Sequence, residues 1–281
     1  GLCQGGLYTP LIVLFRENAP ARRLGSAVGW LIASTSIGYA ISIGLTGLSI
    51  GISGWRLAFL VTGLPPIIGT VILLLAIKSF PNIVHLRVPG ISLWQELRKN
   101  SDTRQLLGGY TAHSWELLGI WAWAPALLTA SFVLYGETTV AATQWSAQFI
   151  MLLHFFGAVA AYTMGRLSDR FGRRTILIWV GSIATGFSFS VGWFVAFMPY
   201  LIAALVIVYA FFAIGDSPVF STAMAESVEP TCLGAMFAVR SLSGFLAGAI
   251  SPVVVGWVID ALRTEQVGDT LIWGSAFSTL G

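Results

Sequence analysis

The chain has 281 residues, of which 56% are hydrophobic and 10% are charged, and its mean hydropathy is +0.81. Soluble globular domains carry about 25% charged residues, so this composition excludes an ordinary soluble enzyme with an apolar core. The net charge of +3 would suggest a nucleic-acid partner in a soluble chain, but here the basic residues lie in short loops between apolar segments. Two cysteines are too few for a disulfide framework. We therefore expect an all-α, polytopic membrane protein in a lipid bilayer, with no nucleic-acid partner.

Apolar segments follow one another along the whole chain. In order they are 1–15, 24–49, 57–77, 106–135, 144–164, 175–197, 200–224, 234–259 and 271–281. A membrane-spanning helix needs about 20 mostly apolar residues, and the seven internal segments meet this requirement. The two terminal segments are shorter, and no Met opens the chain. We therefore expect a piece of a longer protein that is cut inside a helix at each end.

The positions of the basic residues predict the orientation of these segments. With alternate loops taken as cytoplasmic, only Arg56 and Arg263 lie on the outer side. Cytoplasmic loops of membrane proteins carry an excess of Lys and Arg, which the other basic residues fit. The sequence therefore predicts a multi-pass protein of the inner or plasma membrane. The cytoplasmic basic residues are Arg16, Arg22, Arg23, Lys78, Arg87, Arg98, Lys99, Arg104, Arg166, Arg170, Arg173, Arg174 and Arg240.

A charged stretch at 165–177 separates two of the apolar segments. Its pattern is Gly-x-Leu-x-Asp-Arg-x-Gly-Arg-Arg, formed by Gly165, Leu167, Asp169, Arg170, Gly172, Arg173 and Arg174. Arginines alone would fit a turn that only sets orientation, but two glycines and an aspartate at fixed spacing do not. The pattern resembles the signature of the cytoplasmic turn in the major facilitator superfamily of secondary transporters. The resemblance implies that contacts of Asp169 with the neighbouring arginines hold the cytoplasmic side closed.

An internal repeat supports this resemblance. Thr9-Pro10, Glu17 and Pro20 have counterparts about 209 residues later, which are Ser217-Pro218, Glu226 and Pro230. The family has two six-helix halves, so the resemblance implies a bundle of two pseudo-symmetric halves that begins within the fourth helix and ends in the twelfth. We expect three parts: helices four to six at 1–78, a cytoplasmic linker with a short amphipathic helix at 79–105, and helices seven to the start of twelve at 106–281. A monomer is the expected state.

Ionisable residues inside the predicted spans are the candidates for function, because charge in hydrocarbon is costly. His113 and Glu116 lie three residues apart, on one face of their helix. Asp216 and Arg240 lie at comparable depth on consecutive segments, which predicts an ion pair between them. The substrate and proton pathway candidates are Glu116, His113, Trp115, Trp123, His154, Asp216 and Tyr8. Each has a structural alternative: Glu116 as a buried, protonated carboxyl, and His154 as a helix-packing residue.

These patterns predict a transporter rather than an enzyme. No Gly-rich phosphate loop and no metal-ligand spacing occurs, so we expect no ATP drive, no metal and no cofactor. The resemblance implies alternating access for a small polar or anionic solute. We expect H⁺ as a second partner, carried by Glu116, because this carboxyl lies near the predicted midplane of the membrane. Only Gly38 and Gly47 remain of a fifth-helix motif found in many proton-driven exporters, which weakens an antiporter interpretation. The alternatives are a uniporter in which Glu116 only binds substrate, and a transport-dead sensor or scaffold with this fold.

Overall fold

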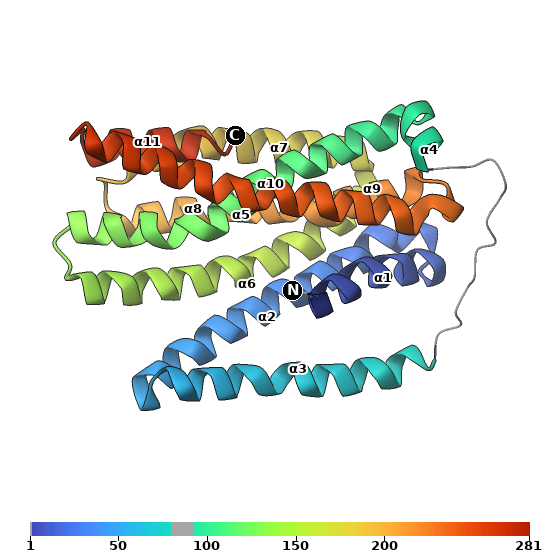
Figure 1. Cartoon of the computed structure of the whole chain (residues 1–281), viewed down its shortest axis with the longest axis horizontal. Coiled ribbons are helices and arrows are strands. Elements are labelled where there is room, and N and C mark those ends of the chain that lie inside the picture. Colours follow the sequence, from blue (N-terminus) through green and yellow to red (C-terminus); the bar gives the residue numbers. More distant parts are fainter. Residues whose placement is uncertain (1, 80–92) are drawn as a thin grey trace.

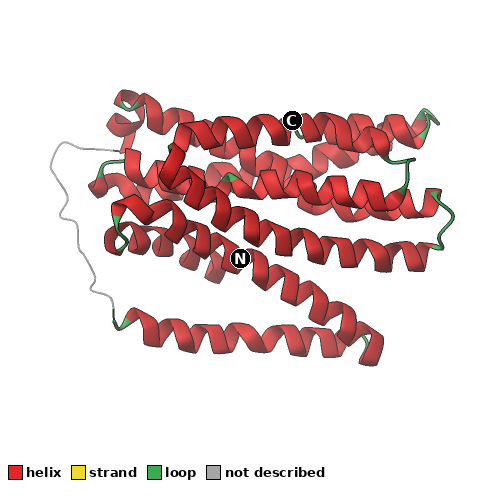
Figure 2. Ribbon diagram, turned by 180° about the vertical axis from the view of Figure 1, so that it is seen from behind, coloured by secondary structure: helices red, strands yellow, loops and turns green. Residues whose placement is uncertain are grey.

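The computed structural model describes the backbone of residues 2–79 and 93–281, and the side chains of residues 9–49, 52–79 and 93–281. Within these ranges the secondary structure is helical throughout, with short connections and no strand (Figure 2). The helices are α1 (Leu2–Asn18), η1 (Ala21–Arg23), α2 (Leu24–Ser53), α3 (Trp55–Ile77), α4 (Leu93–Lys99), α5 (Ser101–Leu134), α6 (Thr139–Phe171), α7 (Arg173–Ser190), η2 (Val191–Phe194), α8 (Pro199–Gly215), α9 (Ser217–Ser227), η3 (Pro230–Cys232), α10 (Leu233–Thr264) and α11 (Asp269–Ser278).

Seven stretches of the described chain are long and apolar enough to cross a membrane. They confirm the predicted all-α, multi-pass fold. The most buried of them is Pro199–Ser227, which comprises α8 and α9, whereas Ala58 is the only buried residue that α3 contributes. Helices α8 and α9 therefore form the centre of the bundle, and α3 lies at its periphery.

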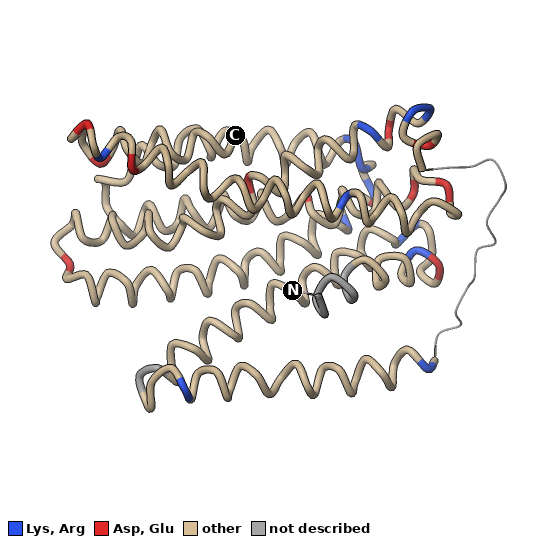
Figure 3. The backbone as a smooth tube through the Cα atoms, in the orientation of Figure 1, with Lys and Arg blue, Asp and Glu red and all other residues tan. Residues whose placement is uncertain are grey.

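Figure 1 shows α1, α2 and α3 on one side of the molecule and α5 to α11 on the other. The most extensive contact between the two groups joins α2 to α6. These two helices lie together at one end of the bundle and diverge toward the other, as both ribbon views show. Most Lys and Arg residues gather at the end where α2 and α6 meet (Figure 3), which we call the basic end. This gathering agrees with the predicted orientation, in which the basic end is cytoplasmic.

Helix α5 begins at Ser101, earlier than the apolar segment 106–135 suggested. Asn100 caps it, with its side-chain oxygen accepting a hydrogen bond from the backbone N–H of Thr103 at 3.1 Å. Hydropathy does not detect a polar first turn of this kind, because such a turn extends beyond the hydrocarbon. Helix α4 ends just before this cap and lies inside the predicted linker, 79–105. Residues 80–92 of that linker are outside the described part of the chain.

The segment predicted as a single helix at 200–224 is two helices, with the break at Asp216. Pro218 lies in the first turn of α9, where its missing N–H leaves no hydrogen bond unmade. Within a continuous helix the same proline would remove a hydrogen bond to the preceding turn. The predicted span is confirmed as one membrane-crossing stretch, Pro199–Ser227. The interruption at Asp216 was not predicted, because proline is tolerated in membrane helices and does not by itself indicate a break.

Close approach of α2 and α6 depends on two glycines near the basic end. A Cβ added to Gly165 would overlap the carbonyl oxygen of Gly25, and a Cβ added to Gly25 would overlap the carbonyl oxygen of Gly165. Small residues let helix backbones approach in this way inside a membrane. Gly165 thus has a packing reason for its place in the signature.

We expect Gly165→Ala to lower the thermal stability of the full-length protein in detergent. The added methyl group meets backbone rather than a flexible side chain, and overpacking of this kind typically costs about 1–3 kcal/mol. The matched control is Gly181→Ala in α7, where an added Cβ meets nothing within 4 Å. Equal melting temperatures for the two variants would contradict the packing role.

Candidate functional site

Asp169 lies near the end of α6 and caps the beginning of α2. Its Oδ1 accepts a hydrogen bond from the backbone N–H of Gly25 at 2.8 Å, and its Oδ2 accepts from the backbone N–H of Ser26 at 2.8 Å. The Ser26 hydroxyl donates a third hydrogen bond, at 2.6 Å. A carboxylate at a helix N-terminus satisfies unpaired N–H groups and interacts favourably with the helix dipole. One side chain therefore joins α6 to α2 across the two groups of helices.

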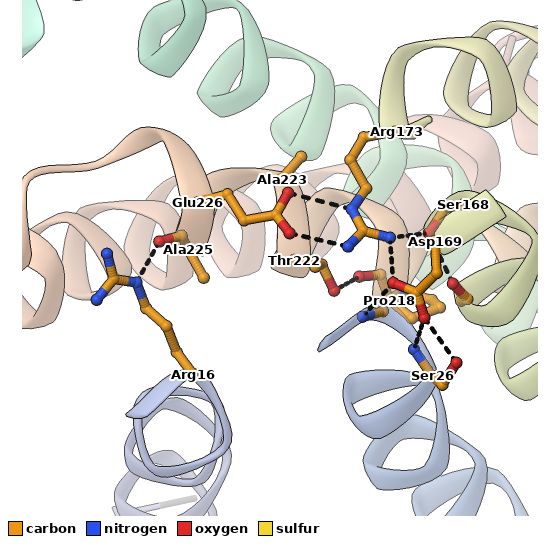
Figure 4. Close-up of polar contacts among 12 residues, drawn as sticks. Arg16, Ser26, Ser168, Asp169, Arg173, Pro218, Thr222, Ala223, Ala225 and Glu226 are labelled. Atoms are coloured by element: carbon orange, nitrogen blue, oxygen red, sulfur yellow. Dashed lines mark hydrogen bonds and ion pairs between the residues drawn. The ribbon is translucent and has the colours of Figure 1, made fainter. Parts of the chain in front are cut away.

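Arg173 extends this contact to α9. Its Nη1 donates to Asp169 Oδ1 at 2.7 Å and to Ser168 Oγ at 2.6 Å. Its Nη2 and Nε donate to Glu226 Oε1 and Oε2 at 2.8 and 3.2 Å, so the guanidinium bridges two carboxylates (Figure 4). We call Ser26, Ser168, Asp169, Arg173 and Glu226 the signature cluster. It links α2, α6, α7 and α9 at the basic end by charge-assisted hydrogen bonds.

The other signature residues have different surroundings. Gly172 has φ +88°, a left-handed conformation that favours glycine, and it separates α6 from α7. Leu167 packs in a small apolar cluster, whereas Arg170 and Arg174 are exposed. The Arg170 guanidinium lies over the Phe171 ring at 5.1 Å. Of the predicted arginine partners of Asp169, the structure therefore brings Arg173 to it.

A second tie joins the two groups of helices. Arg16, near the end of α1, donates from Nε to the carbonyl oxygen of Ala225 near the end of α9, at 2.5 Å (Figure 4). A basic side chain interacts favourably with carbonyl groups at a helix C-terminus. Both ties therefore converge on the last turn of α9.

Farther into the bundle, His113 of α5 meets the break between α8 and α9. Its Nδ1 lies 2.7 Å from Asp216 Oδ1, and its Nε2 lies 2.8 Å from the Ser217 hydroxyl oxygen. The side chains of His113 and Asp216 are buried, at 3% and 5% exposure. Both imidazole nitrogens are thus engaged by the two residues at which the helix is interrupted.

Glu116 lies one turn along α5 from His113, also buried. The Tyr209 hydroxyl of α8 donates to Glu116 Oε1 at 2.9 Å. We call His113, Glu116, Tyr209, Asp216 and Ser217 the buried polar cluster. It places two carboxyls and an imidazole between α5 and the interrupted helix, where a proton can be held or exchanged.

The predicted partner of Asp216 requires a correction. Among the described residues the ion pair of Asp216 is made with His113 rather than with Arg240. Arg240 is fully buried, donates from Nη2 to the Ser221 hydroxyl at 2.8 Å and places its guanidinium 3.5 Å from the centre of the Tyr110 ring. A desolvated guanidinium over an aromatic face is a favourable cation–π contact. The depth of Asp216 and Arg240 was predictable from the sequence, but the rotation of their helices, which decides the partners, was not.

The remaining predicted residues divide between packing and a cavity. The Trp115 indole N–H donates to the carbonyl of Thr279 at 2.8 Å, and that of Trp123 donates to the carbonyl of Pro252 at 2.9 Å. Trp123 and His154 line a cavity of about 850 Å³, whereas Trp115 is not part of its lining. The side chain of Tyr8 lies outside the described residues. Trp115 is thus placed as a packing residue in this arrangement, and Trp123 and His154 face open space between helices.

This cavity lies between α2 and the helices α5, α6, α10 and α11. Residues that the sequence analysis did not select contribute to it, namely Tyr39, Trp121, Arg263 and Trp273. His154 stacks on Tyr39 of α2 with ring centres 5.1 Å apart. No sequence signal pointed to Tyr39, because the contact depends on how α2 crosses α6.

Within the described residues, no group of three or more His, Cys, Asp or Glu side chains could hold a metal ion. The two clusters and the cavity therefore define what the described chain offers: a charged junction at the basic end, titratable groups in the interior, and a cavity between the two groups of helices.

We expect Asp169→Asn to reduce activity of the full-length protein while expression and membrane insertion stay close to normal. An asparagine keeps the size but loses the charge and one acceptor, and hydrogen bonds to charged groups contribute about 1.5–3 kcal/mol each. If the full-length protein is a transporter, as the resemblance of its signature implies, uptake should fall by roughly tenfold or more. The matched control is Asp102→Asn, an exposed aspartate at the start of α5. Unchanged transport in Asp169→Asn would refute the role of the signature cluster.

Single neutralisations of the pair between His113 and Asp216 should reduce the folded yield or the melting temperature sharply. Removing one partner of a buried pair typically costs about 3–5 kcal/mol. The double variant His113→Gln with Asp216→Asn should recover part of the loss, whereas Arg240→Gln with Asp216→Asn should be closer to additive. Thermal unfolding of the three single and two double variants gives this comparison. Additive losses for the first double variant would contradict the pairing.

Comparisons with known proteins agree with the helical architecture. The sequence pattern of the Major Facilitator Superfamily matches residues 1–252. A similar protein is the cis,cis-muconate transport protein of Acinetobacter baylyi (strain ATCC 33305 / BD413 / ADP1), which is 25% identical over 277 aligned positions. These positions cover 90% of this chain and 62% of the relative. The chain thus spans less than two thirds of the length of the relative it matches.

Proposed function

Because this chain belongs to the Major Facilitator Superfamily, we propose that the complete protein carries a small carboxylate across the cell membrane by alternating access. The similarity to a cis,cis-muconate transport protein supports an anionic substrate, and the family supports transport rather than catalysis. The partners in this proposal are the substrate, a proton and the bilayer of the inner or plasma membrane, with the protein acting as a monomer.

The observation that carries this proposal is the contrast between the two ends of α2 and α6. At the basic end, Asp169 holds the first turn of α2 and Arg173 bridges to Glu226 of α9. Toward the opposite end the same two helices diverge (Figure 1). Residues of both helices, among them Tyr39 and His154, line the cavity. Such an arrangement is closed on the basic side and open toward the other, which is one of the two states that alternating access requires.

Passage to the other state requires the signature cluster to separate. The N–H groups of Gly25 and Ser26 lose the carboxylate of Asp169, and Arg173 loses one of its two acidic partners. Arg173 and Glu226 are partly exposed, so water replaces part of these contacts and the net cost of opening is modest. The cluster therefore closes one side without making the closed state permanent.

In the proposed mechanism Glu116 carries the coupling proton. Glu116 is buried and accepts from Tyr209, and one turn away His113 pairs with Asp216. Burial disfavours the charged form of a carboxyl, so proton binding there is coupled to how α5 packs on α8 and α9. Loss of the proton would disturb this packing next to the break in the central helix.

The test of transport uses the full-length protein in proteoliposomes. With an acidic exterior, radiolabelled cis,cis-muconate should accumulate above its external concentration, and a protonophore should abolish the accumulation. Equilibration without accumulation would identify a uniporter instead. If the protein neither takes up nor exchanges muconate, adipate or benzoate, the proposed transport of carboxylates is overturned and a sensor or scaffold is favoured.

We expect Glu116→Gln to abolish accumulation against a gradient while exchange of internal for external substrate continues. A glutamine keeps a hydrogen-bonding partner for Tyr209 but cannot bind or release a proton. The control is Glu137→Gln, an exposed glutamate between α5 and α6. If Glu116→Gln still concentrates muconate with unchanged pH dependence, Glu116 is not the proton carrier.

A further inference from the structure

Three side chains that line the cavity carry a buried polar atom without a hydrogen-bond partner. They are Nδ1 of His154 and the indole Nε1 of Trp121 and of Trp273. A buried indole N–H that makes no hydrogen bond is costly, and most buried polar groups in proteins are satisfied. By contrast, the indole N–H of Trp123 in the same lining is bonded to a backbone carbonyl. Other buried hydroxyls without a partner lie elsewhere in the described chain, for example those of Ser131 and Ser251, but the three ring N atoms all belong to residues that line this one cavity.

Aromatic rings form part of the cavity wall, and small and aliphatic side chains form most of the rest. Tyr39 and His154 stack with an interplanar angle of 25°, and Trp121 meets each of them edge-on, with ring centres 5.3 Å from Tyr39 and 5.4 Å from His154. Trp123 and Trp273 form a second aromatic pair, with centres 6.4 Å apart. A planar ligand with delocalised electrons packs better on such walls than a puckered, saturated one. The volume of about 850 Å³ lies within the range of small-molecule sites.

The charge of the lining selects the sign of the ligand. Aromatic walls also bind cations, through the negative faces of the rings. Here, however, no Asp or Glu is among the described residues that line the cavity, and the lining includes Arg263. An anion that accepts hydrogen bonds from indole and imidazole N–H groups satisfies both the unused donors and the charge.

We propose that this cavity binds a planar, unsaturated carboxylate, with Trp121 and His154 donating hydrogen bonds to the carboxylate and the aromatic walls packing against the conjugated part. The inference rests on the proposed transport of a carboxylate and assigns the binding residues and the ligand class. Tyr39 belongs to α2 and the donors belong to α5 and α6, so the ligand contacts both groups of helices. Closure of the cavity around the ligand is then favoured by contacts from both sides.

The first test compares two ligands on the unmodified full-length protein in nanodiscs. Isothermal titration calorimetry is carried out with cis,cis-muconate and with adipate, which has the same length and the same two carboxylates but a saturated chain. Muconate should bind roughly tenfold more tightly, because only the planar chain packs on the rings. Equal affinities, or binding of neither acid, overturn the inference. Tighter binding of tetramethylammonium than of either acid also overturns it, in favour of a cation site.

The second test removes the donors while keeping aromatic surface. Trp121→Phe and His154→Phe should each weaken muconate binding by roughly 10- to 100-fold, the usual effect of a lost hydrogen bond to a charged group. The matched control is Trp179→Phe, an exposed tryptophan of α7 that does not line the cavity. Unchanged affinity in folded Trp121→Phe and His154→Phe contradicts the assignment.

The two proposals fail in different ways. If muconate binds with these variant effects but is neither taken up nor exchanged, the site stands and the transport proposal falls. If carboxylates are transported while muconate and adipate are equivalent and the variants are normal, transport stands and this site assignment falls.

Discussion

The carboxylate of Asp169 at the first turn of α2 is the contact on which the arrangement of the two groups of helices depends. It replaces hydrogen bonds that the N–H groups of Gly25 and Ser26 would otherwise make to water, and it does so from a different helix. The close approach of Gly25 and Gly165 sets the distance at which this contact can form. The Arg173 guanidinium donates hydrogen bonds to both Asp169 and Glu226. It therefore connects the junction of α2 and α6 to the central helix pair, α8 and α9.

The polar groups at the interruption between α8 and α9 contact one another. His113 uses both nitrogens on Asp216 and Ser217, and Glu116 is bonded by Tyr209. In a low-dielectric interior such contacts are strong when complete and costly when broken. The buried ring nitrogens of Trp121 and His154 have no hydrogen-bond partner and belong to residues that line the cavity, and for this reason we propose a ligand there.

The sequence predicted the helical fold and the distribution of charge between the two ends, because both depend on local composition, and it predicted the family through the spacing of a short motif. The signature stretch was recognised from spacing alone, and Gly172 and Gly165 each have a backbone reason for being glycine. The partners of the signature were not predictable. Gly25 and Ser26 lie 144 and 143 residues from Asp169 along the chain, and they meet it only because α2 crosses α6. For the same reason depth alone suggested Arg240 as the partner of Asp216, whereas helix rotation gives Asp216 to His113. The break at Asp216 and the role of Tyr39 in the cavity wall likewise depend on tertiary packing.

Helix α9 is a short rod that is held at both ends. Its eleven residues span about 16 Å, from Ser217 beside His113 to Glu226 bound by Arg173 and Ala225 bound by Arg16. In the proposed mechanism, α9 moves as one piece, and a shift at its interior end would be transmitted to the signature cluster at the basic end. Thermodynamic linkage makes this coupling reciprocal: whatever free energy a proton in the interior contributes to separating the junction, separation of the junction contributes equally to the affinity for that proton. In that mechanism, α9 would determine how strongly proton binding in the interior is coupled to opening at the basic end.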